Sequence, residues 1–209
     1  MNECIKYIKN RRSINYFDSE KKIDRNLLNE LLELANLSPS SINLQPWEVI
    51  IVEKDENKKL LRECAFNQPK VEEASAVLII IANPKAVEEN IDRVLNNWVK
   101  IGNITSDKID IYKNTAKKLY SDDYKSYKRS IFSVKNTSFF AMSIMISARF
   151  LGLETHPMDG FDEAKIKDTF NIDNYKIIPL LIAIGYPAKN IKLNKRGERR
   201  KLVEFVRYL

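Results

Sequence analysis

The sequence predicts an α+β fold in a single domain spanning residues 1–209. Two kinds of pattern predict it: apolar residues at helical spacing in several segments, and short β-branched runs, bounded by polar residues or proline, between them. With 44% hydrophobic and 30% charged residues, a chain of this length can bury one sizeable core and has no need of a second domain. We therefore expect helices packed against buried strands.

The first expected helix is short and runs from Cys4 to Asn10. The second is stronger, because Asp24 is a good N-cap, apolar residues recur at helical spacing up to Ala35, and Pro39 then stops the helix. Further helices are expected at 56–65, at 139–151, and from a cap at Asp162 to Phe170. The segment 139–151 is apolar on most sides, which indicates a helix buried inside the domain or against a partner subunit.

Buried strands are expected at 49–52, 77–82 and 177–185. The region 84–133 differs in texture, because it is polar and dotted with aromatic residues, and we expect it to form a partly exposed helical insert. These aromatic residues could line a pocket for flat substrates or pack the insert onto the core, and packing is favoured for most of them. They are Trp98, Tyr112, Tyr120, Tyr124, Tyr127 and Phe132.

The net charge of +7 favours small anionic ligands over nucleic acid. Lysine and arginine are interspersed with acidic residues along nearly the whole chain, and only 195–201 is densely basic. No nucleic-acid recognition module accompanies that run. The amino terminus is charged from Glu3 onward and the longest apolar run, 177–184, is too short to cross a bilayer. We expect a cytoplasmic protein without nucleic-acid or membrane partners.

The cysteines and glycines exclude several kinds of site. Neither Cys4 nor Cys64 has a second cysteine at metal-ligand or redox-motif spacing, so we expect two reduced thiols and no metal site. The five glycines cannot form a dinucleotide fingerprint or a P-loop. A phosphorylated cofactor would therefore be held by side chains such as Arg11 and Ser13.

Two stretches near the start of the chain combine anion-binding and loop-forming residues: 11–17 (RRSINYF) and 38–47 (SPSSINLQPW). Guanidinium and hydroxyl groups of the first can bind phosphate oxygens, and hydroxyl and amide groups of the second can bind a polar heteroaromatic ring. For the first stretch taken alone, an ordinary basic helix end is an equally good interpretation. Together the stretches resemble the FMN-binding segments of the nitroreductase family. The candidate ligands are Arg11, Arg12, Ser13, Asn15, Ser40, Ser41, Asn43 and Gln45.

The resemblance continues in two later segments. Residues 67–70 (NQPK) match the place where the family supplies an amide and a lysine to the flavin ring, which implies these roles for Asn67 and Lys70. A lysine there would stabilise the negative charge of the reduced ring. In the segment 151–161, the resemblance places Pro157, Met158, Asp159 and Gly160 against the flavin, with backbone amides facing N5 and O4. The family mechanism needs no catalytic side chain, and we expect the single histidine, His156, to be a loop residue rather than a general acid.

The carboxy-terminal segment also resembles the family, whose late basic residues reach the flavin phosphate. Arg199 is the first choice for this role and Arg200 the second, and Leu202–Val206 is expected to be a strand that joins the partner subunit's sheet. Two positions depart from the family pattern. Asn15 replaces the usual Arg or Lys beside the flavin, and Asp159 replaces a commoner glutamate.

The resemblance implies a three-layer fold, with a central, mainly antiparallel sheet flanked by helices, and an intertwined homodimer with FMN at its interface. It implies an enzyme that passes hydride from NADH or NADPH to FMN and then reduces a small aromatic acceptor, such as a nitro compound or quinone, in ping-pong fashion. A family member with a different, more specific reductive substrate is one alternative. A flavin-binding or storage protein without turnover is another.

Overall fold

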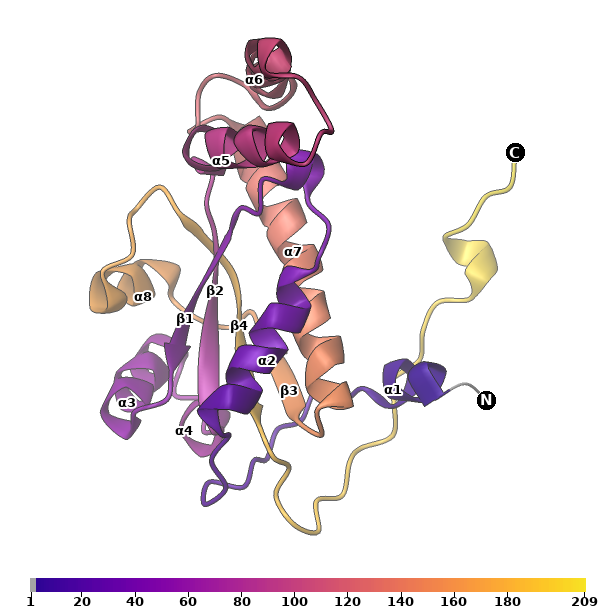
Figure 1. Cartoon of the computed structure of the whole chain (residues 1–209). Helices are drawn as coiled ribbons and strands as arrows, with labels where there is room; N and C mark the ends of the chain where they lie inside the picture. The colour runs from indigo at the N-terminus through magenta and orange to yellow at the C-terminus, as the bar shows by residue number, and fades with distance from the viewer. Residues whose placement is uncertain (1–2) are drawn as a thin grey trace.

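A computed structural model of the chain describes residues 3–209, with side chains from residue 5 onward, and shows helices on both faces of one four-stranded sheet (Figure 1). The helices are α1 (Glu3–Asn10), α2 (Arg25–Asn36), α3 (Asp55–Cys64), α4 (Lys70–Glu73), α5 (Ala86–Lys100), α6 (Ile109–Tyr120), α7 (Tyr127–Phe150) and α8 (Glu163–Phe170). The strands are β1 (Trp47–Val52), β2 (Ala76–Ala82), β3 (Glu154–Met158) and β4 (Ile177–Gly185).

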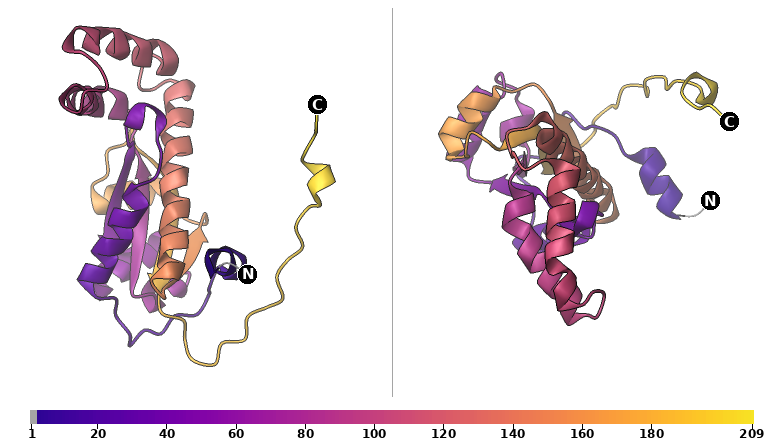
Figure 2. Two further views of the ribbon diagram at one scale, coloured as in Figure 1. Left: turned by 45° about the vertical axis from the view of Figure 1, so that its right-hand side comes forward. Right: turned by 90° about the horizontal axis from the view of Figure 1, so that it is seen from above.

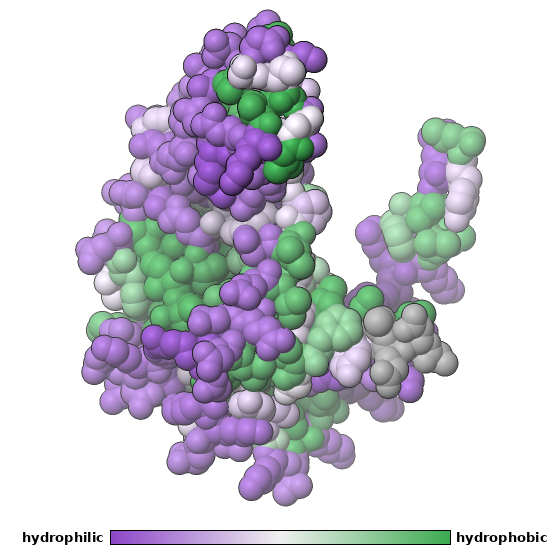
Figure 3. Space-filling model, viewed as in Figure 1, coloured by the Kyte–Doolittle hydropathy of each residue, from purple (hydrophilic) through white to green (hydrophobic). Residues whose placement is uncertain are grey.

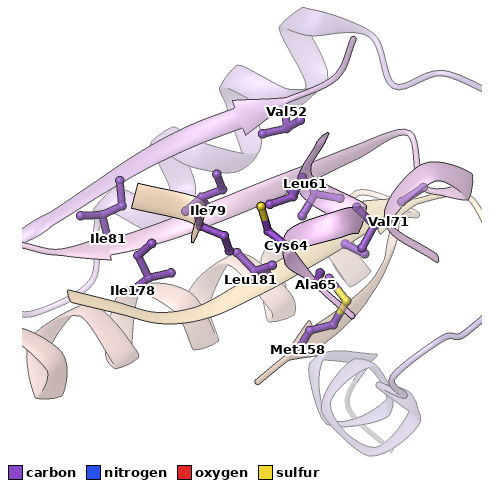
Figure 4. Close-up of a cluster of buried hydrophobic side chains, with 14 of the residues drawn as sticks. Val52, Leu61, Cys64, Ala65, Val71, Ile79, Ile81, Met158, Ile178 and Leu181 are labelled. Carbon is purple, nitrogen blue, oxygen red and sulfur yellow. The ribbon is translucent and has the colours of Figure 1, made fainter. Parts of the chain in front are cut away.

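The sheet has the strand order β1-β2-β4-β3, and each neighbouring pair is antiparallel. Every residue of β2 is buried, because helices cover both faces of this central strand, and its sequence is accordingly a continuous apolar run. The three expected strands and the antiparallel sheet are confirmed. Core side chains between the sheet and α3 are drawn in Figure 4 and include the free thiol of Cys64. The side chain of Cys4 lies outside the described residues.

Strand β3 is a correction to the sequence analysis, which treated His156 as a loop residue. The strand pairs with β4, with His156 opposite Ala183 and Pro157 opposite Ile182. Proline lacks an N–H and is therefore confined mainly to edge strands, and β3 lies at the edge of this sheet. Because proline is rare in strands, the sequence around Pro157 did not indicate a strand. β3 forms nevertheless, because β4 pairs with it.

The expected helices are confirmed, with one large change in length. Asp24 caps α2 by accepting the N–H of Asn26 at 2.8 Å, and Asp162 caps α8 by accepting that of Lys165 at 3.1 Å. Helix α7 begins at Tyr127, well before the expected start at 139. Its first half looks polar in the sequence because several of its buried side chains are polar, and they bond to α5, to the end of α6 and to the loop before β1. These include Arg129, Ser133, Asn136 and Thr137.

The region 84–133 is helical, as expected, and α5 and α6 form a lobe at one end of the molecule (Figure 2). Its aromatic residues mostly pack together: Trp98 meets Tyr112 edge to face, and Tyr120 lies 4.3 Å from Phe132 between ring centroids. Tyr127 is the exception and is 81% exposed. Packing is therefore the role of most of these rings.

Arg129 ties this lobe to α7. Its side chain is fully buried and makes two hydrogen bonds to the Glu88 carboxylate, at 2.7 and 2.6 Å. It also donates to the main-chain carbonyls of Pro84, Tyr120 and Ser121. One buried guanidinium thus satisfies groups from three segments.

Helix α7 is the one described helix long and apolar enough to cross a membrane by length and composition. A single such helix is weak evidence, because the core helix of a soluble protein passes the same test. Here α7 contacts α2 and all four strands, as a core helix does.

The carboxy-terminal segment differs from expectation. Leu202–Glu204 forms one 3₁₀ turn in an exposed tail that leaves the body of the molecule (Figures 1 and 2). The expected strand at Leu202–Val206 is therefore wrong for the isolated subunit. A strand needs a neighbour to pair its N–H and C=O groups, and within residues 3–209 none pairs with this tail.

Replacing Arg129 with Met should lower the free energy of unfolding by about 3 kcal/mol, because the buried carbonyls would lose their donor. Urea unfolding followed by the fluorescence of Trp47 and Trp98 measures the effect. Lys128→Met, at an exposed neighbouring position, is the matched control and should cost less than about 0.5 kcal/mol. Equal stabilities for the two variants would contradict the role given to Arg129.

Candidate functional site

The first stretch lies along the outer edge of β3. Ser13 bridges to Thr155 in parallel, and the Ile14 N–H donates to the Thr155 carbonyl at 3.1 Å. Ile14 is buried, and successive side chains of an extended chain alternate in direction. Ser13 and Asn15 accordingly point to the exposed side, where a ligand can reach them.

Arginine side chains gather beside this edge. The Nη1 atom of Arg11 is buried and has no hydrogen-bond partner. Arg196 donates to the Arg11 carbonyl at 3.1 Å, and Arg12 donates to the Asn194 carbonyl at 2.7 Å. Burial lowers the pKa of Arg11, and so do the nearby charges of Arg196, Arg199 and Arg12.

No carboxylate within residues 5–209 forms an ion pair with these four arginines. A buried, unpartnered N–H among like charges fits the phosphate of a cofactor such as FMN. Arg199 belongs to this cluster, whereas Arg200 lies over the Phe205 ring at 5.5 Å. Arg196 was not among the predicted ligands, although it stands in the same basic run.

The segments 67–70 and 157–160 meet next to the same edge. Gln68 Nε2 donates to the Gly160 carbonyl at 2.8 Å, and Lys70 Nζ donates to Gln68 Oε1 at 3.1 Å. Burial lowers the pKa of Lys70, and Glu73 opposes this shift. Sequence reasoning missed Gln68, which stands between the two predicted ligands Asn67 and Lys70.

At 157–160 a ligand can reach the backbone, but it cannot reach every side chain. The Met158 side chain is 3% exposed and belongs to the core, whereas Asp159 and Gly160 are exposed. A Cβ at Gly160 would meet only ordinary contacts, the nearest being Gln68 Nε2 at 3.5 Å. The fold itself does not require glycine here, and the absence of a side chain leaves room for a ligand to approach the backbone.

His156 fastens the first stretch to β3. Its Nδ1 lies 3.0 Å from the Ile14 carbonyl, which can only accept, so Nδ1 carries the proton. Burial lowers the pKa of His156, the charge of Lys70 lowers it further, and the bond to Ile14 opposes both. The imidazole is therefore neutral near pH 7, and its role is to hold the first stretch against β3.

The second stretch forms a tight loop at the other end of α7. Ile42, Asn43 and Gln45 all have positive φ, at 55°, 54° and 45°. The Ser41 N–H donates to Asn136 Oδ1 at 3.0 Å, and the Ser41 hydroxyl bonds to the Tyr120 hydroxyl. Ser40 Oγ closes the loop by accepting the Gln45 N–H at 2.9 Å. Sequence reasoning missed both supporting residues, because they come from distant helices.

One subunit does not bring the two stretches together. Ser41 is held at Asn136, whereas α1, which precedes Arg11, packs at the last turn of α7, where Tyr7 meets Phe150 at 4.6 Å. From position 136 to 150 a helix rises about 20 Å. Figure 1 shows the same separation, with α1 beside one end of α7 and the loop after α2 beside the other. Within one subunit the two stretches therefore lie apart.

Comparison with known proteins places this arrangement in a family. The model of the nitroreductase family matches residues 8–186. The chain belongs to the nitroreductase family. MhqN of Bacillus subtilis, provisionally named an NAD(P)H nitroreductase, is 32% identical over 216 residues that cover both chains completely. The crystal structure of ydfN from the same organism, provisionally a nitroreductase, has a TM-score of 0.91 at 31% identity and covers 99% of each chain.

Not every relative bears a nitroreductase name. The CLA biosynthesis enone reductase of Lactiplantibacillus plantarum is 29% identical over 94% of this chain and 91% of its own length. The expected nitroreductase resemblance and α+β fold are confirmed, and this nitroreductase-family protein is an oxidoreductase.

The pKa of His156 should lie below its ordinary value of 6.5 and should rise in Lys70→Ala, because a neighbouring positive charge is removed. As the unfolded chain binds the proton more readily, this group's contribution to stability is complete above pH 6.5 and declines as pH falls below it. NMR titration is unambiguous, since the chain has one histidine. Lys128→Ala, far from β3, should leave this pKa unchanged, and a value above 6.5 would contradict the environment described.

Proposed function

We propose that this protein is an FMN-dependent NAD(P)H oxidoreductase that reduces small aromatic acceptors such as nitro compounds and quinones. The observation that carries the proposal is the buried, unpartnered Nη1 atom of Arg11 within a cluster of arginines. Names of relatives support it. One structural neighbour, from Staphylococcus epidermidis, is provisionally named an NAD(P)H:FMN oxidoreductase and has a TM-score of 0.85 at 28% identity.

The chain's own residues have separable roles in this proposal. Arg11, Arg12, Ser13 and Arg199 would bind the phosphate through charge-assisted hydrogen bonds. Asn67 and Lys70 would bind the ring edge, where the ammonium stabilises negative charge. The chemistry that bound FMN supplies is acceptance of hydride from NADH or NADPH and its transfer onward. The protein therefore binds and orients the cofactor and substrate, and no side chain has to exchange a proton. Asn15 is neutral, which leaves Lys70 as the main cation at the ring.

We also propose a homodimer that completes the site. A two-fold partner can bring its 40–45 loop to the arginine cluster of the first subunit. Apolar side chains exposed on one subunit are available for this contact: Ile8, Phe139, Met142, Phe150, Val203 and Phe205. Figure 3 shows the outer part of the tail as largely apolar. We expect the enzyme to work in the cytoplasm without nucleic-acid or membrane partners.

A second candidate is a more specific reduction at the same flavin. The enone reductase among the relatives supports it, because one flavin site serves different acceptors within a family. A third candidate, a flavin-binding protein without turnover, would share the cofactor but not the hydride transfer.

The purified protein should be yellow, should release FMN rather than FAD on denaturation, and should oxidise NADH or NADPH faster when a nitroaromatic is added. Parallel double-reciprocal plots would establish ping-pong turnover. Quinones and enones tested beside nitroaromatics separate the first candidate from the second, and flavin without NAD(P)H oxidation would indicate the third. A colourless protein that also fails to bind added FMN would overturn the proposal.

Arg11→Ala should weaken FMN binding roughly ten- to a hundredfold through the loss of charge-assisted hydrogen bonds, while turnover at saturating FMN stays near that of the wild type. Arg25→Ala, an exposed position at the start of α2, is the matched control. Subunit sharing is tested by co-expressing Arg11→Ala with Asn43→Ala, since a mixed dimer then holds one intact site. With random pairing about a quarter of all sites should regain wild-type affinity. No regain would place the whole site within one subunit.

A further inference from the structure

A cavity of about 570 Å³ opens between the α6–α7 connection, the end of α8 and the start of β4. This is the α8 side of the sheet, away from the face covered by α2 (Figure 1). None of the predicted flavin ligands lines it. Its walls are formed mainly by Tyr124, Lys125, Ser130, Lys167, Tyr175 and Lys176.

Two tyrosines form a rigid aromatic wall of this cavity. Tyr124 and Tyr175 meet edge to face, with ring centroids 5.7 Å apart. The Lys85 ammonium lies 3.9 Å from the Tyr175 centroid and 4.6 Å from that of Tyr124. Lys125 Nζ lies 5.8 Å from the Tyr124 centroid. Lys176 Nζ lies 5.9 Å from the Tyr175 centroid. Three ammonium groups therefore gather around one pair of rings.

Of the three lysines that line the cavity, two have carboxylate partners. Lys167 pairs with Glu163 at 2.7 Å, and Lys176 pairs with Glu48 at 2.8 Å and with Asp173 at 3.4 Å. Lys85 and Lys125 form no ion pair with any carboxylate of residues 5–209. A phosphate monoester carries a charge of about −1.5 to −2 at pH 7, and Lys125 in the cavity wall, with Lys85 nearby, offers unpaired positive charge to it.

We propose that this cavity is a second ligand site, which binds a phosphorylated small molecule with a planar body, of the size of a nucleoside monophosphate. The phosphate lies by Lys125, and the planar body lies against Tyr124 and Tyr175. Lys85 does not line the cavity, but its ammonium beside the two rings adds positive charge. The volume is within the range of about 300–1,000 Å³ found for small-molecule sites. The proposal is independent of the FMN site, because the two share no residue.

Calorimetric titration of the FMN-saturated, full-length protein with AMP tests the site. AMP should bind more tightly than inorganic phosphate or adenosine, and higher ionic strength should weaken it. Lys125→Ala and Tyr175→Leu should each weaken AMP binding about tenfold, the loss expected for one charge-assisted contact or one aromatic wall. Lys128→Ala and Tyr127→Leu are the matched controls, since they remove the same side chains from exposed positions outside the cavity.

Absence of AMP binding to the wild type, or AMP binding that Lys125→Ala leaves unchanged, would overturn the proposal. Lys125 is exposed, so its replacement leaves the fold intact and the test does not depend on the tyrosine variant. AMP binding no tighter than that of inorganic phosphate would overturn the role of the aromatic wall. FMN affinity should be equal in all four variants, which separates failure here from failure of the proposed flavin enzyme.

Discussion

The helix α7 determines how the rest of the subunit is arranged. Its carboxy-terminal half covers the sheet and receives α1, and its amino-terminal half holds the α5–α6 lobe through Arg129 and the 40–45 loop through Asn136. An α-helix of 24 residues is about 36 Å long and cannot shorten. The two stretches are therefore kept apart within one subunit by a rigid element, which is why we propose that a two-fold partner completes the site.

The arginines beside β3 lie close enough for their positive charges to repel one another. Like charges that are partly buried and unpaired destabilise the folded state, and the lowered pKa of Arg11 expresses that cost. Phosphate binding would relieve the repulsion and so would stabilise the fold, since a ligand that binds the native state shifts the unfolding equilibrium. The lysines around Tyr124 and Tyr175 differ, because carboxylates already neutralise Lys167 and Lys176. The two basic regions thus differ in both cation chemistry and residual charge.

The sequence by itself determined the local elements and the kind of chemistry. Apolar spacing located α2, and α3 was expected between two strands. The caps at Asp24 and Asp162 act as their residue types predict. The apolar runs of β2 and β4 identified the centre of the sheet, because strands covered on both faces have no polar side. The two early stretches, with arginine, serine and amide side chains, indicated a phosphorylated cofactor. All these signals are short-range, so they can be read without knowing the path of the chain.

Only the tertiary structure decided the rest. β3 contains Pro157 and becomes a strand because β4 pairs with it, and the first half of α7 looks polar because its buried partners are polar. The supports of the site, such as Tyr120 for Ser41 and Gln68 for Gly160, join residues far apart in sequence, so no local pattern reveals them. The separation of the two stretches along α7 likewise follows from packing. Contacts between distant segments depend on the whole fold, whereas propensity and periodicity act over a few residues.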